Sequence, residues 1–260
     1  MEVHAHSHTP RKKWTHYFWE FLMLFLAVFC GFLAENQREH FIEHRREKEF
    51  MNSMLSDLRS DTAKSNAVHQ TFSIVVQHID SLIPLLQAEM EPPEKALNIY
   101  QHSVFLNYYN KWNYTDRTIN QLKNSGSFRL IRNKKVSDMI MDYDGYVRNF
   151  VENMQDMYIL PQWRNVNETG ADIFRSSVFR KFFLSFYGKE TTVQLPLPPY
   201  FLTTDKNKVL RLINLYEQYA VAVEWFNINV KNALEMAVKL DSTIRREYHL
   251  SADRQTPLEK

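Results

Sequence analysis

The sequence predicts an all-α protein in which an N-terminal transmembrane helix continues into a long-helix bundle or coiled-coil-like domain. An unbroken apolar run near the N-terminus, a helical spacing of apolar residues after it, and the lack of any convincing period-two alternation predict this class. With 260 residues, of which 44% are hydrophobic and 24% charged, the chain has the composition of a folding protein.

Composition excludes several classes of function. The chain holds five glycines and no Gly-x-Gly, so it carries neither a P-loop nor a Rossmann phosphate turn. The single cysteine, Cys30, rules out an internal disulfide and a zinc site built on cysteines. The formal net charge of +2 is too small to indicate a nucleic-acid partner.

The first expected element is a membrane anchor. The apolar run over residues 21–34 would span about 21 Å as a helix, and adding residues 17–20 lengthens it to about 27 Å, against a hydrocarbon core of roughly 30 Å. Aromatic rings at its start favour the headgroup level. We expect lipid contact from Trp14, Tyr17, Trp19, Phe21, Leu24, Val28 and Phe32. A buried helix of a soluble protein and a cleavable signal peptide are the alternatives.

The anchor predicts a chain that crosses the membrane once, with a cytoplasmic N-terminus and everything after Ala34 on the other side. The positive-inside rule does not decide the orientation, because three Lys and Arg residues precede the span and four follow it. The opposite orientation therefore stays open. We expect a polar tail over 1–16, the transmembrane helix over 17–35, an extracytoplasmic helical bundle over 36–250 and a polar tail over 251–260.

The segment after the anchor carries a heptad pattern. Positions 51, 55, 58, 62, 65, 69, 72, 76, 79, 83 and 86 step by four and three and hold mostly apolar residues. Since no Gly or Pro lies between Phe32 and Ile83, we expect the membrane helix to continue until Pro84 kinks its end. This stripe is expected to pack on later helices of the same chain, with a homo-oligomeric coiled coil as the alternative.

Further helices are expected downstream. They cover residues 95–111, a short stretch from a cap at 113–116 to Asn124, a long stretch from Ile131 or Asn133 to Pro161, residues 172–187, and a last long helix capped by Thr203 or Thr204. Gly126 is expected to stop the short helix. Residues 195–200 must be extended, because consecutive prolines fix φ and remove backbone donors.

Three segments carry a resemblance to a known family. They are the anchor with its charged exit over residues 18–35, residues 54–58, and residues 118–133 with the sequence Leu-Lys-Asn-Ser-Gly. These segments resemble a family of uncharacterised single-pass inner-membrane proteins common in Bacteroidota. The similarity covers the anchor and the Leu-Lys-Asn-Ser-Gly segment well and the C-terminal half loosely. It implies a Gram-negative inner membrane and an extracytoplasmic helical domain, and it brings no activity and no catalytic residue.

A metal-binding pattern follows the anchor. His40, Glu43 and His44 match the H-x-x-E-H pattern of inverted zinc peptidases, in which two histidines one helical turn apart hold zinc and the glutamate activates water. We interpret these residues as the solvated face of a charged juxtamembrane helix. We therefore expect no metal, no cofactor and no catalytic residue, and a zinc-dependent hydrolase is kept as an alternative.

The helix expected over 172–187 is unusually aromatic and basic. Arg175, Arg180 and Lys181 lie between its aromatic residues. Such a helix can dock on a partner or a lipid surface, and the contact candidates are Phe179, Phe182, Phe183 and Phe186. Packing of the rings in the core, with the basic residues outside, is the simpler interpretation.

These features favour a non-enzymatic function. We expect a membrane-anchored helical-bundle protein that acts through protein–protein contacts, as a scaffold, assembly factor or accessory subunit. Its expected partners are the lipid bilayer and other membrane or periplasmic proteins, with a homo-oligomer left open. A periplasmic ligand-binding sensor module is the first alternative. With only about 15 residues across the membrane, such a sensor would need a partner to pass on its signal.

Overall fold

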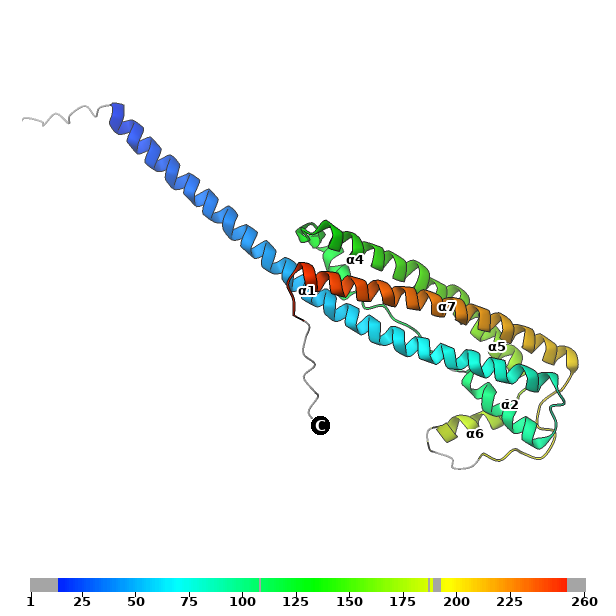
Figure 1. The fold of residues 1–260 in the computed structure, drawn as a ribbon. Helices are drawn as coiled ribbons and strands as arrows, with labels where there is room; N and C mark the ends of the chain where they lie inside the picture. The colour runs from blue at the N-terminus through cyan, green and yellow to red at the C-terminus, as the bar shows by residue number, and fades with distance from the viewer. Residues whose placement is uncertain (1–13, 108, 187, 189–192, 252–260) are drawn as a thin grey trace, which may run out of the picture. The chain divides into compact units, whose positions relative to one another are not determined.

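The computed structural model describes residues 14–107, 109–186, 188 and 193–251. These residues form helices and their connections with no strand among them, which confirms the all-α prediction (Figure 1). The elements are α1 (Trp14–Gln87), α2 (Pro93–Phe105), α3 (Arg117–Asn124), the 3-10 turn η1 (Ser127–Leu130), α4 (Lys134–Tyr146), the π-helical segments η2 (Val147–Glu152) and η3 (Gln155–Ile159), α5 (Leu160–Ala171), α6 (Ser176–Phe186) and α7 (Lys206–Glu247).

The chain divides into two units, residues 1–50 and 51–260, and each is described by itself. The second unit begins at Met51, whereas we expected the bundle to begin at residue 36. Helix α1 contributes to both units and is continuous over 74 residues. This confirms the expected continuation of the apolar helix. Pro84 lies only three residues before the end of α1, where the loss of one backbone donor interrupts little of the helix.

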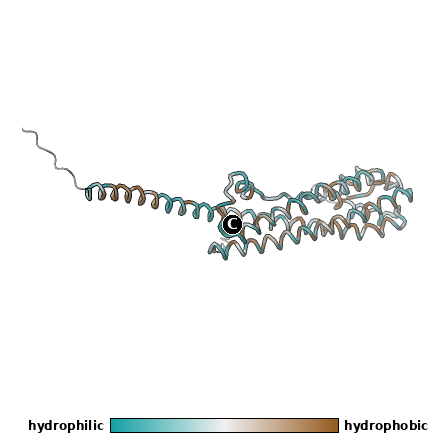
Figure 2. Tube along the Cα trace, turned by 90° about the horizontal axis from the view of Figure 1, so that it is seen from above, coloured by the Kyte–Doolittle hydropathy of each residue, from teal (hydrophilic) through white to brown (hydrophobic). Residues whose placement is uncertain are grey.

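In the first unit, α1 is long and apolar enough to cross a membrane. Figure 2 shows this stretch as the brown part of the helix near its N-terminal end. None of its apolar window is buried. The anchor side chains named above, Trp14, Tyr17, Trp19, Phe21, Leu24, Val28 and Phe32, are all exposed.

In the second unit, three long helical stretches lie side by side among the described residues (Figure 1). They are α1 from Met51 onward, the run from α4 to α5, and α7. The heptad stripe of α1 lies mostly in the core, where the rings of Phe72 and Phe226 meet edge to face with centroids 5.4 Å apart. The stripe is therefore covered by the chain's own helices, and His69 is its exposed member.

Helix α2 ends at Phe105, six residues before the expected boundary. The segment after it is extended because side chains of other elements take its backbone donors. The Trp112 amide donates to Gln155 Oε1 at 3.0 Å, and the Thr115 amide donates to Asp61 Oδ1 at 2.8 Å. A regular helix would need those amides for its own hydrogen bonds.

Pro161 does not end the long helix, contrary to the prediction. Helix α4 begins after the cap Asn133, whose side chain accepts from the Val136 amide at 3.2 Å. The helix then continues through η2 and η3 into α5, with Pro161 in the first turn of α5. The wider turns of the π segments relieve the clash that a proline ring makes with the preceding turn of a regular α-helix.

The last two helices begin later than expected. Helix α6 begins at Ser176, and the amide of Arg175 just before it donates to the Tyr100 hydroxyl at 2.9 Å. The cap of α7 is Asp205, whose carboxylate accepts from the Lys208 amide at 3.0 Å. Thr203, one of the two expected caps, instead accepts from the amide of Asp205.

Candidate functional site

The aromatic helix expected over 172–187 packs into an aromatic cluster. Tyr100 of α2 lies at its centre and is fully buried. The rings around Tyr100, with centroids between 5.3 and 6.1 Å from it, are those of Phe174, Phe179, Phe182 and Phe201. Its hydroxyl donates to Tyr200 O at 2.8 Å, and burial raises its pKa above the ordinary value. The cluster therefore fixes α6 against α2.

This cluster corrects part of the expected contact surface. Phe182 is 4% exposed and stacks on Tyr100, so its assignment as a partner contact is wrong. Phe179 is half-buried in the same cluster. Phe183 is exposed and remains accessible. The side chain of Phe186 lies outside the described residues.

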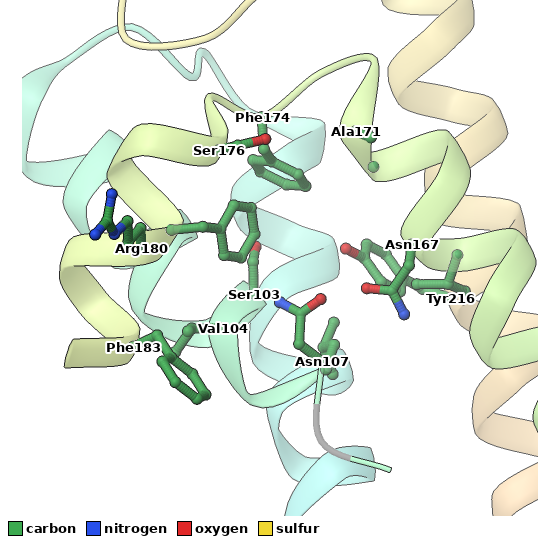
Figure 3. A pocket seen from close by; sticks show the side chains of 14 residues that line it. Ser103, Val104, Asn107, Asn167, Ala171, Phe174, Ser176, Arg180, Phe183 and Tyr216 are labelled. Atoms are coloured by element: carbon green, nitrogen blue, oxygen red, sulfur yellow. The ribbon is translucent and has the colours of Figure 1, made fainter. Parts of the chain in front are cut away.

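A cavity of about 310 Å³ opens beside the cluster, between α2, α5, α6 and α7 (Figure 3). Its apolar walls include Val104, Val166, Phe174 and Phe179. Its polar lining includes Ser103, Asn107, Asn167, Ser176, Arg180 and Tyr216. The Tyr216 ring is buried, and burial raises the pKa of its hydroxyl, opposed in part by hydrogen bonding to Ser103. The hydroxyl is therefore neutral at physiological pH.

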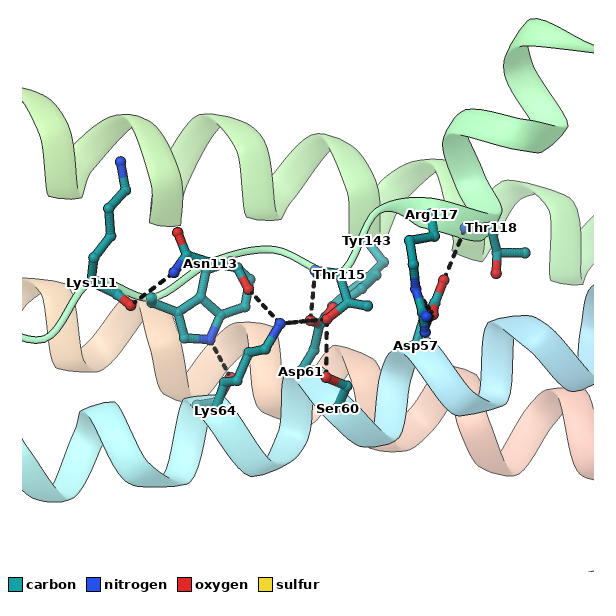
Figure 4. A network of polar contacts seen from close by, with 12 residues as sticks. Asp57, Ser60, Asp61, Lys64, Lys111, Asn113, Thr115, Arg117, Thr118 and Tyr143 are labelled. Carbon is teal, nitrogen blue, oxygen red and sulfur yellow. Dashed lines mark hydrogen bonds and ion pairs between the residues drawn. The ribbon is translucent and has the colours of Figure 1, made fainter.

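Elsewhere in the bundle, buried carboxylates fasten the extended segment to α1 (Figure 4). Asp61 accepts from the Thr115 amide at 2.8 Å and from the Tyr143 hydroxyl at 2.9 Å. Asp57 accepts from the Thr118 amide at 2.9 Å and so caps α3 from a neighbouring helix. Burial raises the pKa of Asp61, opposed by its hydrogen bonds to Thr115 and Tyr143. These carboxylates satisfy donors that the extended backbone would otherwise leave unpaired.

The Leu-Lys-Asn-Ser-Gly segment of the resemblance also has a structural role. Leu122 is fully buried, and Lys123 forms an ion pair with the buried Asp144. Asp144 also accepts from Arg148 Nε at 3.0 Å. Gly126 adopts a left-handed φ of 65° after α3, a conformation that glycine tolerates without strain. The ion pair between Lys123 and Asp144 thus holds the end of α3 against α4.

The H-x-x-E-H residues lie on α1 in the first unit. His40 and His44 are exposed and Glu43 is half-buried. His44 Nδ1 lies 3.5 Å from Glu47 Oε2, one helical turn further on. Within the part of the chain that the structure describes, no group of three or more His, Cys, Asp or Glu side chains could hold a metal ion. The described residues therefore offer no complete zinc site around this pattern.

An exposed apolar surface, which we call the α7 face, runs across α7 and η3. It consists of Tyr158, Val221, Trp225 and Ile228. Val221, Trp225 and Ile228 share one side of α7, because their spacing of four and three matches the helical repeat. The rings of Trp225 and Tyr158 touch edge to face at 5.7 Å and join this side of α7 to η3.

Sequence reasoning missed both the cavity and the α7 face. The cavity escapes it because the walls come from four elements distant in sequence. The α7 face had a signal, since 221, 225 and 228 form a second apolar stripe beside the buried one. No protein-family model, curated protein or solved structure compared with this chain matches it.

Proposed function

We propose that this protein is a membrane-anchored helical bundle that acts through protein–protein contacts, as a scaffold, assembly factor or accessory subunit of a membrane complex. The observation that carries the proposal is the α7 face. Its four large side chains are exposed on a bundle whose other long stripes pack inward. Contiguous exposed apolar surface of this kind is unfavourable in water and marks contact sites in soluble domains.

The composition of the α7 face supports a protein partner. It combines Trp225 and Tyr158 with the aliphatic residues Val221 and Ile228, and these aromatic residues are enriched at protein interfaces. Trp225 is 49% exposed and Tyr158 51%, so each ring keeps half of its surface for a partner while the other half is held by the bundle. Such partly fixed rings lose little conformational entropy on binding.

The proposed location is a bacterial inner membrane, with the N-terminus in the cytoplasm and the bundle in the periplasm. The exposed apolar stretch of α1 supports an anchor in lipid. Carbonate washing of membranes tests the anchor: the full chain is expected in the pellet, and its release into the supernatant would contradict the proposal. For the orientation, a C-terminal tag should become sensitive to protease once the outer membrane is opened. A tag that stays protected would place the bundle in the cytoplasm.

The contact function is tested on the full chain, extracted from its own membranes in a mild non-ionic detergent. We expect native electrophoresis to show a complex larger than a single chain in a micelle. The double variant Val221→Asp/Ile228→Asp should migrate as the single chain, because a buried unpaired carboxylate opposes docking.

Leu197→Asp is the matched control, since Leu197 is exposed on a different segment. This variant should keep the complex. A single-chain size for the unmodified protein, or equal loss of the complex in the control, would contradict the proposal.

A further inference from the structure

We propose that the cavity between α2, α5, α6 and α7 binds a small uncharged amphiphile, with an aromatic or aliphatic body and an amide or hydroxyl head group. This site lies on different side chains from the α7 face, so the inference does not depend on the contact function. Ligand binding was the first alternative expected from the sequence, and the cavity provides a place for it.

The size of the cavity limits the ligand. Its volume of about 310 Å³ lies at the small end of the range for ligand sites, about 300–1,000 Å³. At about 30 Å³ for each water-sized group, this space accommodates about ten non-hydrogen atoms. The ligand is therefore a small molecule rather than a lipid chain or a folded peptide.

The walls that would contact the body of the ligand are already held in place. Phe174 and Phe179 line the cavity, and their rings meet edge to face with centroids 5.2 Å apart. Both also pack against the buried Tyr100. Because these rings are fixed by the core, a ligand would bind without first ordering them, which favours affinity.

The head group would meet neutral hydrogen-bonding groups. Asn107, Asn167 and Tyr216 all line the cavity, and Figure 3 shows their side chains. The Asn167 amide nitrogen donates to Trp163 O at 2.7 Å, which leaves its oxygen as an acceptor. The exposed Asn107 amide offers both a donor and an acceptor. An amide head carries the complementary pair of groups.

Charge then decides the class of ligand. None of the described lining residues carries a carboxylate, and Arg180 is the one cation among them. Arg180 is exposed, and in Figure 3 its guanidinium points away from Asn107 and Asn167. A charged head group would lose its hydration in the cavity without a nearby opposite charge, which is unfavourable. An uncharged ligand avoids that loss.

The test uses the full chain in lipid nanodiscs, so that no detergent competes for the cavity. The probe is 3-phenylpropanamide, and 3-phenylpropionate is the charged analogue of the same shape. Calorimetry should show saturable binding of the amide with a dissociation constant of about 1 mM or tighter, as expected for a ligand of this size. The carboxylate should bind at least about tenfold more weakly, because Arg180, the one cation among the described lining residues, points away from the head-group side of the cavity. Empty nanodiscs correct for partition into lipid.

Two variants place the binding in this cavity. Ala171→Trp narrows it from an exposed position on α5, and Asn107→Leu removes a head-group partner from an exposed position after α2. Both should weaken amide binding at least about fivefold. Ala67→Trp, at an exposed position of α1 outside the cavity, is the matched control and should bind like the unmodified protein.

Equal binding of amide and carboxylate, no saturable binding of the amide, or unchanged binding in both cavity variants would overturn the inference. Thermal unfolding of each variant shows whether it keeps the fold. Because Asn107→Leu changes a solvent-exposed side chain, it remains informative if Ala171→Trp does not fold.

Discussion

Replacing Asp61 by alanine tests the role of the buried carboxylates. Asp61 is 1% exposed and accepts from the Thr115 amide and the Tyr143 hydroxyl. Alanine would leave both donors unpaired, at about 1–3 kcal/mol each, while its better helix propensity returns about 0.5 kcal/mol. We therefore expect the free energy of unfolding of the bundle to fall by about 2–5 kcal/mol.

The assay is thermal unfolding of the full chain in nanodiscs, followed by circular dichroism. For a domain of roughly 200 residues, each kcal/mol lowers Tm by about 2–4 °C, so the expected fall is about 4–20 °C. Asp80→Ala is the matched control, since Asp80 is an exposed carboxylate on the same helix. Its effect should stay within about 0.5 kcal/mol.

A double variant that also removes the Tyr143 hydroxyl tests the hydrogen bond between Tyr143 and Asp61. In the double variant Asp61→Ala/Tyr143→Phe, the hydroxyl donor is removed together with its acceptor. The combined loss should therefore be smaller than the sum of the two single losses. If Asp61→Ala is as mild as Asp80→Ala, the carboxylate does not fasten the extended segment. If the two losses add fully, the hydrogen bond between Tyr143 of α4 and Asp61 does not contribute to stability.

Three further predictions concern the bundle. The rings of Phe72 and Phe226 are fully buried against each other, so Phe226→Ala should cost about 3–5 kcal/mol in urea unfolding, and a mild effect would contradict the packing. Burial lowers the pKa of His78 and of His102, and the charge of His102 lowers that of His78 further; their Nδ1 atoms lie 2.9 Å apart. The free energy of unfolding that these neutral histidines contribute should therefore be present above their ordinary pKa of about 6.5 and be lost as pH falls below it. Tm scans should show this loss, reduced in His78→Gln/His102→Gln. Asp205→Ala removes the α7 cap and should cost about 0.5–2 kcal/mol, with Thr204→Ala as the milder control.

Local patterns in the sequence were enough for the helical elements. The lack of Gly and Pro between Phe32 and Ile83 predicted one continuous helix, and α1 is continuous. The Asn133 cap and the Gly126 stop were also predicted from their neighbours in sequence, and both are confirmed. These features depend on residues within one or two helical turns, so a single sequence contains their causes.

Boundaries that depend on distant partners were predicted wrongly. Helix α2 stops early because Asp61 and Gln155 take amides of the segment that follows it. The helix was expected to end at Pro161 but continues through it, because the wider turns of the π segments leave room for the proline ring. In both cases the deciding group belongs to another turn or another helix, and its position is set by packing.

The same distinction between local and distant causes applies to the fold class and to the candidate sites. The amino-acid sequence alone determined the all-α class, the apolar helix near the N-terminus and the buried stripes of α1 and α7, because periodicity and composition are properties of contiguous residues. Only the tertiary structure decided that Phe182 is buried while Phe183 is exposed, and that α2, α5, α6 and α7 enclose a cavity. Those outcomes depend on which distant side chains meet, and that is settled by how the helices pack together.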